Sequence, residues 1–119
     1  MAEPGLWLPT GGDLGTIAAN VGLGRPPEPA GVLDQIAGLL ADQGGRAHTA
    51  GILYKIVAMT RPYGPDSRLF ALEAARVVLI ANGFLATRIS PERADGLWAD
   101  VEAGKCATAG DIGRRLTEL

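Results

Sequence analysis

The residues whose types could do chemistry gather in one short stretch, residues 61–68, between two stretches of helical periodicity. It holds Arg61 and Arg68, with Asp66 and Ser67 between them. Arg61, Ser67 and Arg68 are candidates for binding an anion, because the first turn of a helix presents free N–H groups and a partial positive charge. The simpler interpretation is a loop and a helix cap, since Asp and Ser are common capping residues.

Two other potentially reactive residues stand alone. His48 is the one histidine of the sequence and Cys106 its one cysteine. A metal site needs several ligands, and a catalytic thiol needs an activating partner, so we assign neither role. His48 precedes Arg61 by about three helical turns, or ~20 Å at the usual rise per residue, which is too far to replace it. A single cysteine also excludes a disulfide within the sequence, which favours a reducing, cytoplasmic setting.

The hydrophobic pattern around these residues predicts an all-α fold. Apolar residues recur at helical spacing, and glycines or prolines separate the segments. Pro62 is incompatible with a helix interior and displaces the preceding residue from helical angles, which leaves residues 61–66 as a loop. Helices are predicted over 13–21, from 32 to the Gly44–Gly45 stop, over 47–60 and 67–81, from 91 to before Gly104, and from 108 onward.

Several of these helices carry further expectations. Asp13 is expected to cap the first, Asp66 or Ser67 the fourth, and Ser90 the fifth. Residues 67–81 are apolar nearly all the way round, which is typical of a buried central helix. Residues 84–89 are expected to be extended. The residues expected on one buried stripe of the second helix are Val32, Leu33, Ile36, Leu39 and Leu40.

Three further expectations concern the ends of the sequence and its two tryptophans. Trp7 and Trp98 are expected to act as core or interface anchors. Arg114 and Arg115 are expected on a solvated face or near the C-terminal dipole of the last helix. Residues 1–12 form an irregular lead-in and residues 13–119 one helical domain.

Composition narrows the classes of partner. Of 119 residues, 47% are apolar and 20% charged, which favours a globular domain over disorder. Eleven basic and thirteen acidic residues give a formal net charge of -2. That balance disfavours nucleic acid or an anionic membrane as the main partner. The longest apolar run, residues 77–81, is far shorter than the ~20 residues that cross a bilayer.

The ordered segments resemble the Doc branch of the Fic/Doc family, the death-on-curing toxins. Residues 61–71 (RPYGPDSRLFA) correspond to the family pattern H-P-F-x-D-G-N-K-R-T-A. Residues 31–37 (GVLDQIA) are similar to its early G-L-L-E-A-A-L helix, and residues 79–84 (LIANGF) to its F-L-x-x-N-G-Y helix end. Residues 101–105 (VEAGK), followed by Ile112, are similar to its V-A-x-G-x…I tail. The resemblance spans about residues 14–116 and implies a helical bundle around a buried central helix.

The resemblance also implies a chemistry, and the sequence departs from it. In the family, the histidine accepts a proton from a hydroxyl of a target protein. Loop N–H groups bind nucleotide phosphates, an acidic residue holds Mg²⁺ and an arginine neutralises developing charge. Doc proteins phosphorylate a translation factor in this way, and Fic relatives attach AMP.

The positions of the motif that carry this chemistry differ here. Arg61 replaces the histidine, and a guanidinium is protonated at any usable pH and has no acceptor for a proton. Pro65 stands at the acidic metal ligand and offers no N–H. The remaining replacements are Asp66 for glycine, Ser67 for asparagine and Leu69 for arginine. Pro62, an aromatic at Tyr63 and the basic Arg68 remain, and a one-residue shift would align Arg68 with the family arginine without supplying a histidine.

Three hypotheses follow. The first is a catalytically degenerate Doc-like protein, without cofactor, that acts as a protein-binding or regulatory module in a bacterial or phage toxin–antitoxin-like setting. Its partner would be another protein, such as an antitoxin-like one, and a homo-oligomer stays open. The second is an active phosphotransferase or nucleotidyltransferase that uses ATP and Mg²⁺, with Asp66 on the metal and Arg61 or Arg68 on phosphate. The third is a helical domain unrelated to the family.

Overall fold

The computed structural model of the chain describes residues 6–23, 27–28, 30–41, 46–83 and 91–118. These residues form six α-helices and one short 3₁₀ turn, so the predicted all-α class is confirmed. The helices are α1 (Gly11–Asn20), α2 (Val32–Ala41), α3 (Arg46–Thr60), α4 (Ser67–Ala81), α5 (Pro91–Glu102) and α6 (Ala109–Glu118), with the 3₁₀ turn η1 (Gly64–Asp66) before α4.

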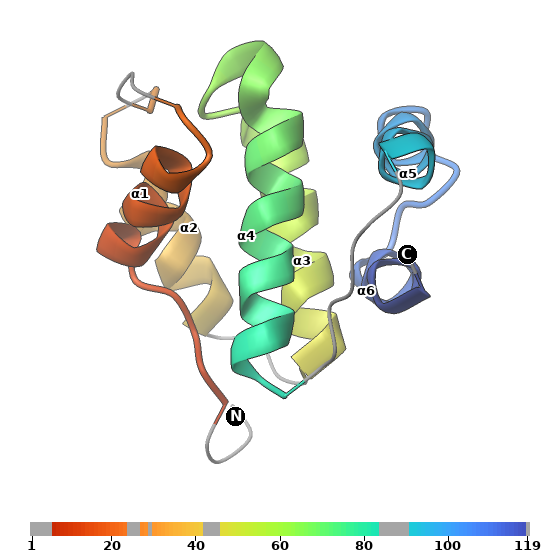
Figure 1. Cartoon of the computed structure of the whole chain (residues 1–119), viewed down its shortest axis with the longest axis horizontal. Helices are drawn as coiled ribbons and strands as arrows, with labels where there is room; N and C mark the ends of the chain where they lie inside the picture. The colour runs from red at the N-terminus through yellow and green to blue at the C-terminus, as the bar shows by residue number, and fades with distance from the viewer. Residues whose placement is uncertain (1–5, 24–26, 29, 42–45, 84–90, 119) are drawn as a thin grey trace.

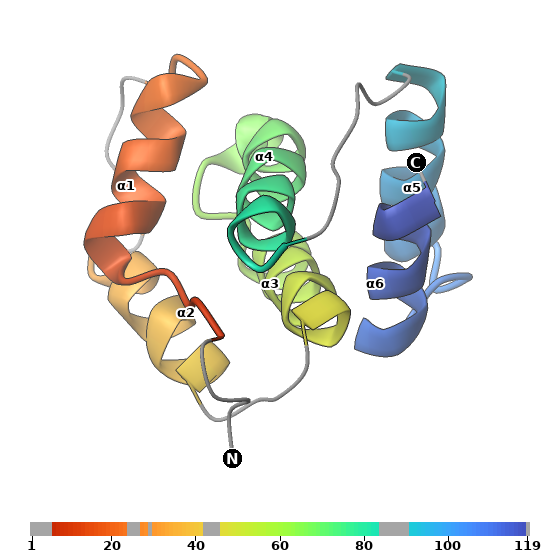
Figure 2. The ribbon, with the colours of Figure 1, turned by 60° about the horizontal axis from the view of Figure 1, so that its bottom comes forward.

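The helices pair into three layers. Figure 2 shows α1 with α2 on one side, α3 with α4 in the middle, and α5 with α6 on the other side. The two helices of the middle layer are the longest, at 15 residues each. The loop that joins them, residues 61–66, lies at one end of this middle layer. The middle pair therefore positions the residues that the sequence singles out.

Local capping fixes the helix ends, not always where the sequence suggests. The N-cap of α1 is Thr10, whose hydroxyl accepts the Asp13 N–H at 3.1 Å, while the Asp13 carboxylate accepts the Thr10 N–H at 3.0 Å. The N-cap is therefore three residues earlier than the predicted Asp13, and Asp13 contributes to the capping box from inside the helix. At the other end of the chain, the Thr108 hydroxyl accepts the Asp111 N–H at 3.1 Å and caps α6.

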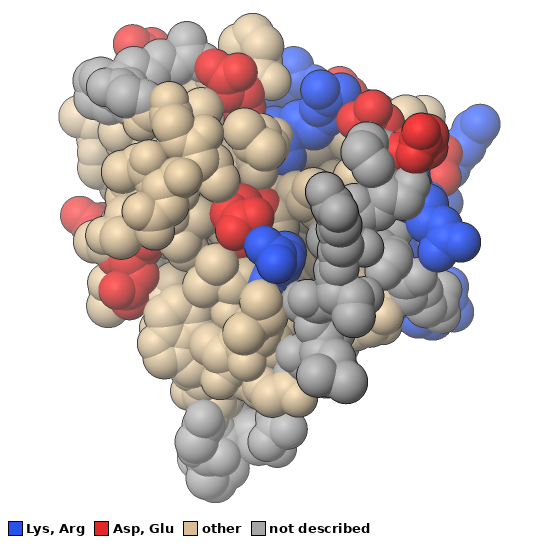
Figure 3. Space-filling model, viewed as in Figure 1, with Lys and Arg blue, Asp and Glu red and all other residues tan. Residues whose placement is uncertain are grey.

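The core lies between the layers, and two predictions of burial need correction. Leu39 has 55% of its surface exposed, although its spacing predicts the buried stripe of α2. On α4, Leu69 and Ile80 are 45% and 48% exposed. That helix is central in the arrangement, but one of its faces is open, and Figure 3 shows mostly uncharged surface over α1 and α4. The largest fully buried side chains are Tyr54, Phe70, Leu14, Ile36, Leu40, Leu53, Leu97 and Ile112.

The first described residues are fastened to the end of α4. The Asn82 side chain accepts the Trp7 N–H at 2.6 Å and donates to the Trp7 carbonyl at 3.0 Å. It also donates to the Val78 carbonyl at 2.8 Å, and it is buried. Trp7 packs against the core, which confirms its predicted role as an anchor.

Some predictions fall outside the described residues. These are the Gly44–Gly45 helix stop, the extended segment 84–89 and the Ser90 cap. In the described part of the chain, no helix is both long enough and apolar enough to cross a bilayer.

Candidate functional site

The loop before α4 begins with a residue in an unusual backbone conformation. Arg61 has φ = 47°, and among the described residues no other residue besides glycines has a positive φ. This confirms that the residue before Pro62 leaves the helix. The left-handed region costs about 1–2 kcal/mol for a residue with a Cβ. The turn continues through Gly64, whose N–H donates to the Arg61 carbonyl at 3.1 Å.

The Arg61 side chain is engaged by α5. Its guanidinium forms an ion pair with Glu102, and its central carbon lies 5.8 Å from the centroid of the Trp98 ring. The two charged side chains are 49% and 43% exposed, so the contact is at the surface. They border a pocket of about 360 Å³ together with Lys55 and Met59.

Ser67 and Tyr63 lie inside the protein. Ser67 is fully buried, and its hydroxyl accepts the Tyr63 N–H at 3.0 Å. The Tyr63 ring packs edge-on against Phe70 with centroids 5.0 Å apart, and burial raises the pKa of Tyr63. Asp66 occupies the N-cap position of α4 but makes no capping hydrogen bond with its side chain. The predicted side-chain cap is therefore wrong: the Ser67 hydroxyl closes the preceding turn instead.

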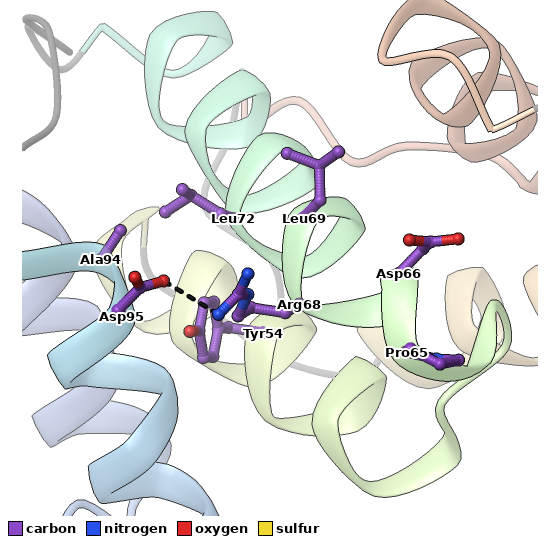
Figure 4. Close-up of a pocket in the computed structure, with 8 residues that line it drawn as sticks. All are labelled: Tyr54, Pro65, Asp66, Arg68, Leu69, Leu72, Ala94 and Asp95. Atoms are coloured by element: carbon purple, nitrogen blue, oxygen red, sulfur yellow. Dashed lines mark ion pairs between the residues drawn. The ribbon is translucent and has the colours of Figure 1, made fainter. Parts of the chain in front are cut away.

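Arg68 lies at a second pocket, of about 380 Å³, between α3, α4 and α5. Its guanidinium is 3.1 Å from the Asp95 carboxylate of α5. In Figure 4 this ion pair crosses from α4 to α5, and the Asp66 carboxylate points away from it. We call this cavity the Arg68 pocket. Its lining consists of Tyr54, Pro65, Asp66, Arg68, Leu69, Leu72, Ala94 and Asp95.

One face of α5 therefore contacts both Arg61 of the loop and Arg68 in the first turn of α4. Asp95, Trp98 and Glu102 follow the i, i+3, i+7 spacing of a single helical face. They meet Arg68 at one end and Arg61 at the other. The two arginines thus do not converge on one site. Sequence reasoning missed these partners, although the spacing of two acids around a tryptophan was visible.

Beneath this face lies Tyr54 of α3. Only 1% of it is exposed, and its ring meets Trp98 edge-on with centroids 5.9 Å apart. Burial raises the pKa of Tyr54; the smaller effects of Arg115 and Arg68 lower it, and those of Cys106 and Asp95 raise it. The phenol is protonated at neutral pH, as any tyrosine is, and can donate a hydrogen bond. Tyr54 was not singled out from the sequence beyond its place in a predicted helix.

The remaining candidates lie elsewhere. His48 is exposed in the first turn of α3, as expected, and Cys106 is buried. Arg115 pairs with Asp100 of α5 at 2.6 Å, and that hydrogen bond raises the pKa of Arg115. Arg115 lies in the last turn of α6, near its C-terminal dipole as one of the two expectations has it, and it also links α6 to α5. Arg114 is exposed and pairs with Asp111.

The residues of the loop do not assemble a Mg²⁺ site in the described part of the chain. There, no group of three histidine, cysteine or acidic side chains is close enough to share a metal ion. Asp66 points away from Arg68 in Figure 4, so a metal on one and a phosphate on the other would not adjoin. We derive no reaction step through ATP or a metal from this arrangement.

Comparison of the chain with models of known protein families, with curated proteins and with solved structures gives no match.

Proposed function

We propose that the protein is a catalytically degenerate, Doc-like module that binds or regulates another protein in a bacterial or phage toxin–antitoxin-like setting. One observation carries the proposal. Where the resemblance requires a proton acceptor, Arg61 presents a guanidinium that is paired with Glu102 and lies over Trp98. A permanently protonated group cannot abstract a proton, and here it contributes to joining α5 to the loop.

The surface beside the loop supports a role in binding. Leu69 in the first turn of α4 is 45% exposed, and Met59 at the end of α3 is 74% exposed. Both residues lie close in sequence to the loop, and exposed apolar side chains can contact a partner protein. Leu69 also lines the Arg68 pocket, so a partner on this face of α4 would reach the degenerate motif.

The first experiment asks about catalysis. Purified protein is incubated with radiolabelled ATP, Mg²⁺ and a cell lysate, and labelled proteins are separated by electrophoresis. We expect no label beyond that of the lysate alone. Label on a target that disappears with Asp66→Ala would reject the proposal and establish the second candidate, a phosphotransferase or nucleotidyltransferase acting on protein hydroxyls. That candidate has one supporting observation: Asp66 and Arg68 line the same pocket.

The second experiment asks about binding. Affinity-tagged protein is used to isolate partners from cells of the native host, and Leu69→Arg is compared with Leu39→Arg. Both leucines are about half exposed, but only Leu69 borders the motif. We expect Leu69→Arg to lose the partner and Leu39→Arg to retain it. Equal retention by both variants would reject this face as the binding surface.

A further inference from the structure

The Arg68 pocket combines three features of a small-molecule site. Its volume of about 380 Å³ falls within the usual range for such sites, roughly 300–1,000 Å³. Leu69, Leu72 and Ala94 supply apolar wall, and Arg68 with Asp95 supply a charged rim. Small-molecule sites typically pair an apolar lining with a few convergent polar groups.

The buried wall of the pocket holds a hydrogen-bonding group that the protein does not use. Tyr54 is almost completely buried, and within the described residues its hydroxyl has no hydrogen-bond partner. The same part of the chain contains no enclosed polar side-chain atom that lacks a partner. The hydroxyl oxygen is therefore not fully enclosed, and Tyr54 is one of the residues that line the Arg68 pocket. A phenol is protonated at neutral pH even at its usual pKa of 10.0, so the hydroxyl has a proton to donate.

The charges around the pocket select the ligand. The rim holds one guanidinium, Arg68, and one carboxylate, Asp95, side by side. A simple anion would match Arg68 alone, and a simple cation would match Asp95 alone. A molecule that carries both charges satisfies the two sides of the rim. The Arg68–Asp95 pair is exposed and opens readily, because such pairs contribute little stability.

We propose that the Arg68 pocket binds a free amino acid with an apolar side chain. The ligand carboxylate accepts hydrogen bonds from the Arg68 guanidinium and the Tyr54 hydroxyl. Its ammonium group takes the place of Arg68 beside Asp95, and its side chain packs on Leu69 and Leu72. This inference goes beyond the proposed function, and it concerns binding alone, so it does not depend on whether the protein is a catalyst.

Titration calorimetry at neutral pH tests the proposal. L-leucine and L-phenylalanine are compared with N-acetyl-L-leucine, which lacks the ammonium, and L-leucinamide, which lacks the carboxylate. We expect both modified compounds to bind at least about tenfold more weakly, since each leaves one charged side of the rim unpaired. No binding of either amino acid up to millimolar concentration overturns the proposal, and so does equal binding of all four compounds.

Three variants locate the binding. Tyr54→Phe keeps the ring against Trp98 and removes only the hydroxyl, so we expect about three- to tenfold weaker binding of L-leucine. Arg68→Gln should weaken it by at least as much. Arg114→Gln is the matched control, because Arg114 is also an exposed arginine in an ion pair, and it should bind as wild type. Unchanged binding by Tyr54→Phe and Arg68→Gln overturns the assignment, as does displacement of L-leucine by ATP and Mg²⁺ alone at equal concentration.

Discussion

The two C-terminal helices contact the middle layer in different ways. Helix α6 meets α3 backbone to backbone: a Cβ built on Gly51 would lie 1.9 Å from the Ala109 carbonyl oxygen and 2.7 Å from the Gly113 nitrogen. Helix α5 meets α3 and the start of α4 through long side chains. There the contacts are two exposed ion pairs and a buried Trp98, with a pocket at each end.

The two contacts therefore have different roles: the α3–α6 contact holds the fold together, and the α5 contact contains the candidate site. The contact between α3 and α6 leaves no space for a side chain at Gly51, so it fixes the position of α6. The contact with α5 leaves cavities of about 360 and 380 Å³. The ion pairs at their rims are exposed and contribute little stability, so a charged group of a ligand or of another protein can displace them. All the arginines of the motif lie on this second contact. Substitutions should therefore act on stability at α6 and on binding at α5.

The largest effect is expected at Gly51. Gly51→Ala places a methyl group against backbone atoms that cannot rotate away, so α3 and α6 must separate. We expect a loss of about 3 kcal/mol in the free energy of unfolding, at the upper end of the cost of overpacking. Chemical denaturation followed by circular dichroism measures it.

Gly96→Ala is the matched control on α5. Gly96 also lies inside a helix, but a Cβ there meets nothing within 4 Å. We expect it to stabilise the protein by roughly 0.5–1 kcal/mol, because alanine loses less backbone freedom on folding. If the two substitutions had similar effects, the two contacts would not differ in the way described.

The second largest effect is expected at alkaline pH, which should lower the free energy of unfolding. Burial raises the pKa of Tyr54 and of Tyr63 above their usual value of 10.0, so above pH 10 the unfolded chain loses phenolic protons that the folded chain retains. Their contribution is complete below pH 10 and declines as pH rises, by up to about 1.4 kcal/mol per pH unit for each tyrosine. Denaturant unfolding below and above pH 10 measures this slope. Tyr54→Phe should make it smaller, and an unchanged slope in that variant would contradict burial of the phenol under α5.

The sequence predicted most of the helices because their signals are local. Pro62 and the apolar periodicity placed the end of α3 and the start of α4 within a residue. The exposure of Leu39, Leu69 and Ile80 could not be predicted in the same way. A stripe identifies which residues share a face, but which faces are covered depends on how the three layers assemble.

The candidate site was predicted only in part. The loop and both arginines were identified from their types and order, but the partners of Arg61 and Arg68 lie 41 and 27 residues away along the chain. Ion pairs at such separations leave no periodic signal. The Tyr54 hydroxyl was also missed, because only the pocket around it distinguishes it from any other aromatic side chain in a helix.

A smaller effect on stability is expected from the backbone conformation of Arg61. Its positive φ favours glycine, so Arg61→Gly should be more stable than Arg61→Ala by about 1 kcal/mol, although both lose the same side-chain contacts. Denaturant midpoints of the two variants, measured side by side, provide the comparison. An Arg61→Ala variant as stable as Arg61→Gly would show that the turn relaxes when the guanidinium is removed from Glu102 and Trp98.

The smallest effect concerns the ion pair between Arg61 and Glu102. Arg61 and Glu102 are both almost half exposed, so solvent screens their attraction. A double-mutant cycle with Arg61→Gln and Glu102→Gln should give a coupling of about 0.2–1 kcal/mol in low salt, and it should shrink at ~1 M salt because the Debye length falls to about 3 Å. A coupling of ~3 kcal/mol or more that persists in high salt would mean that α5 is held as firmly as α6. A ligand or partner could then not displace these ion pairs, and the α5 contact would serve to stabilise the fold, as the α6 contact does.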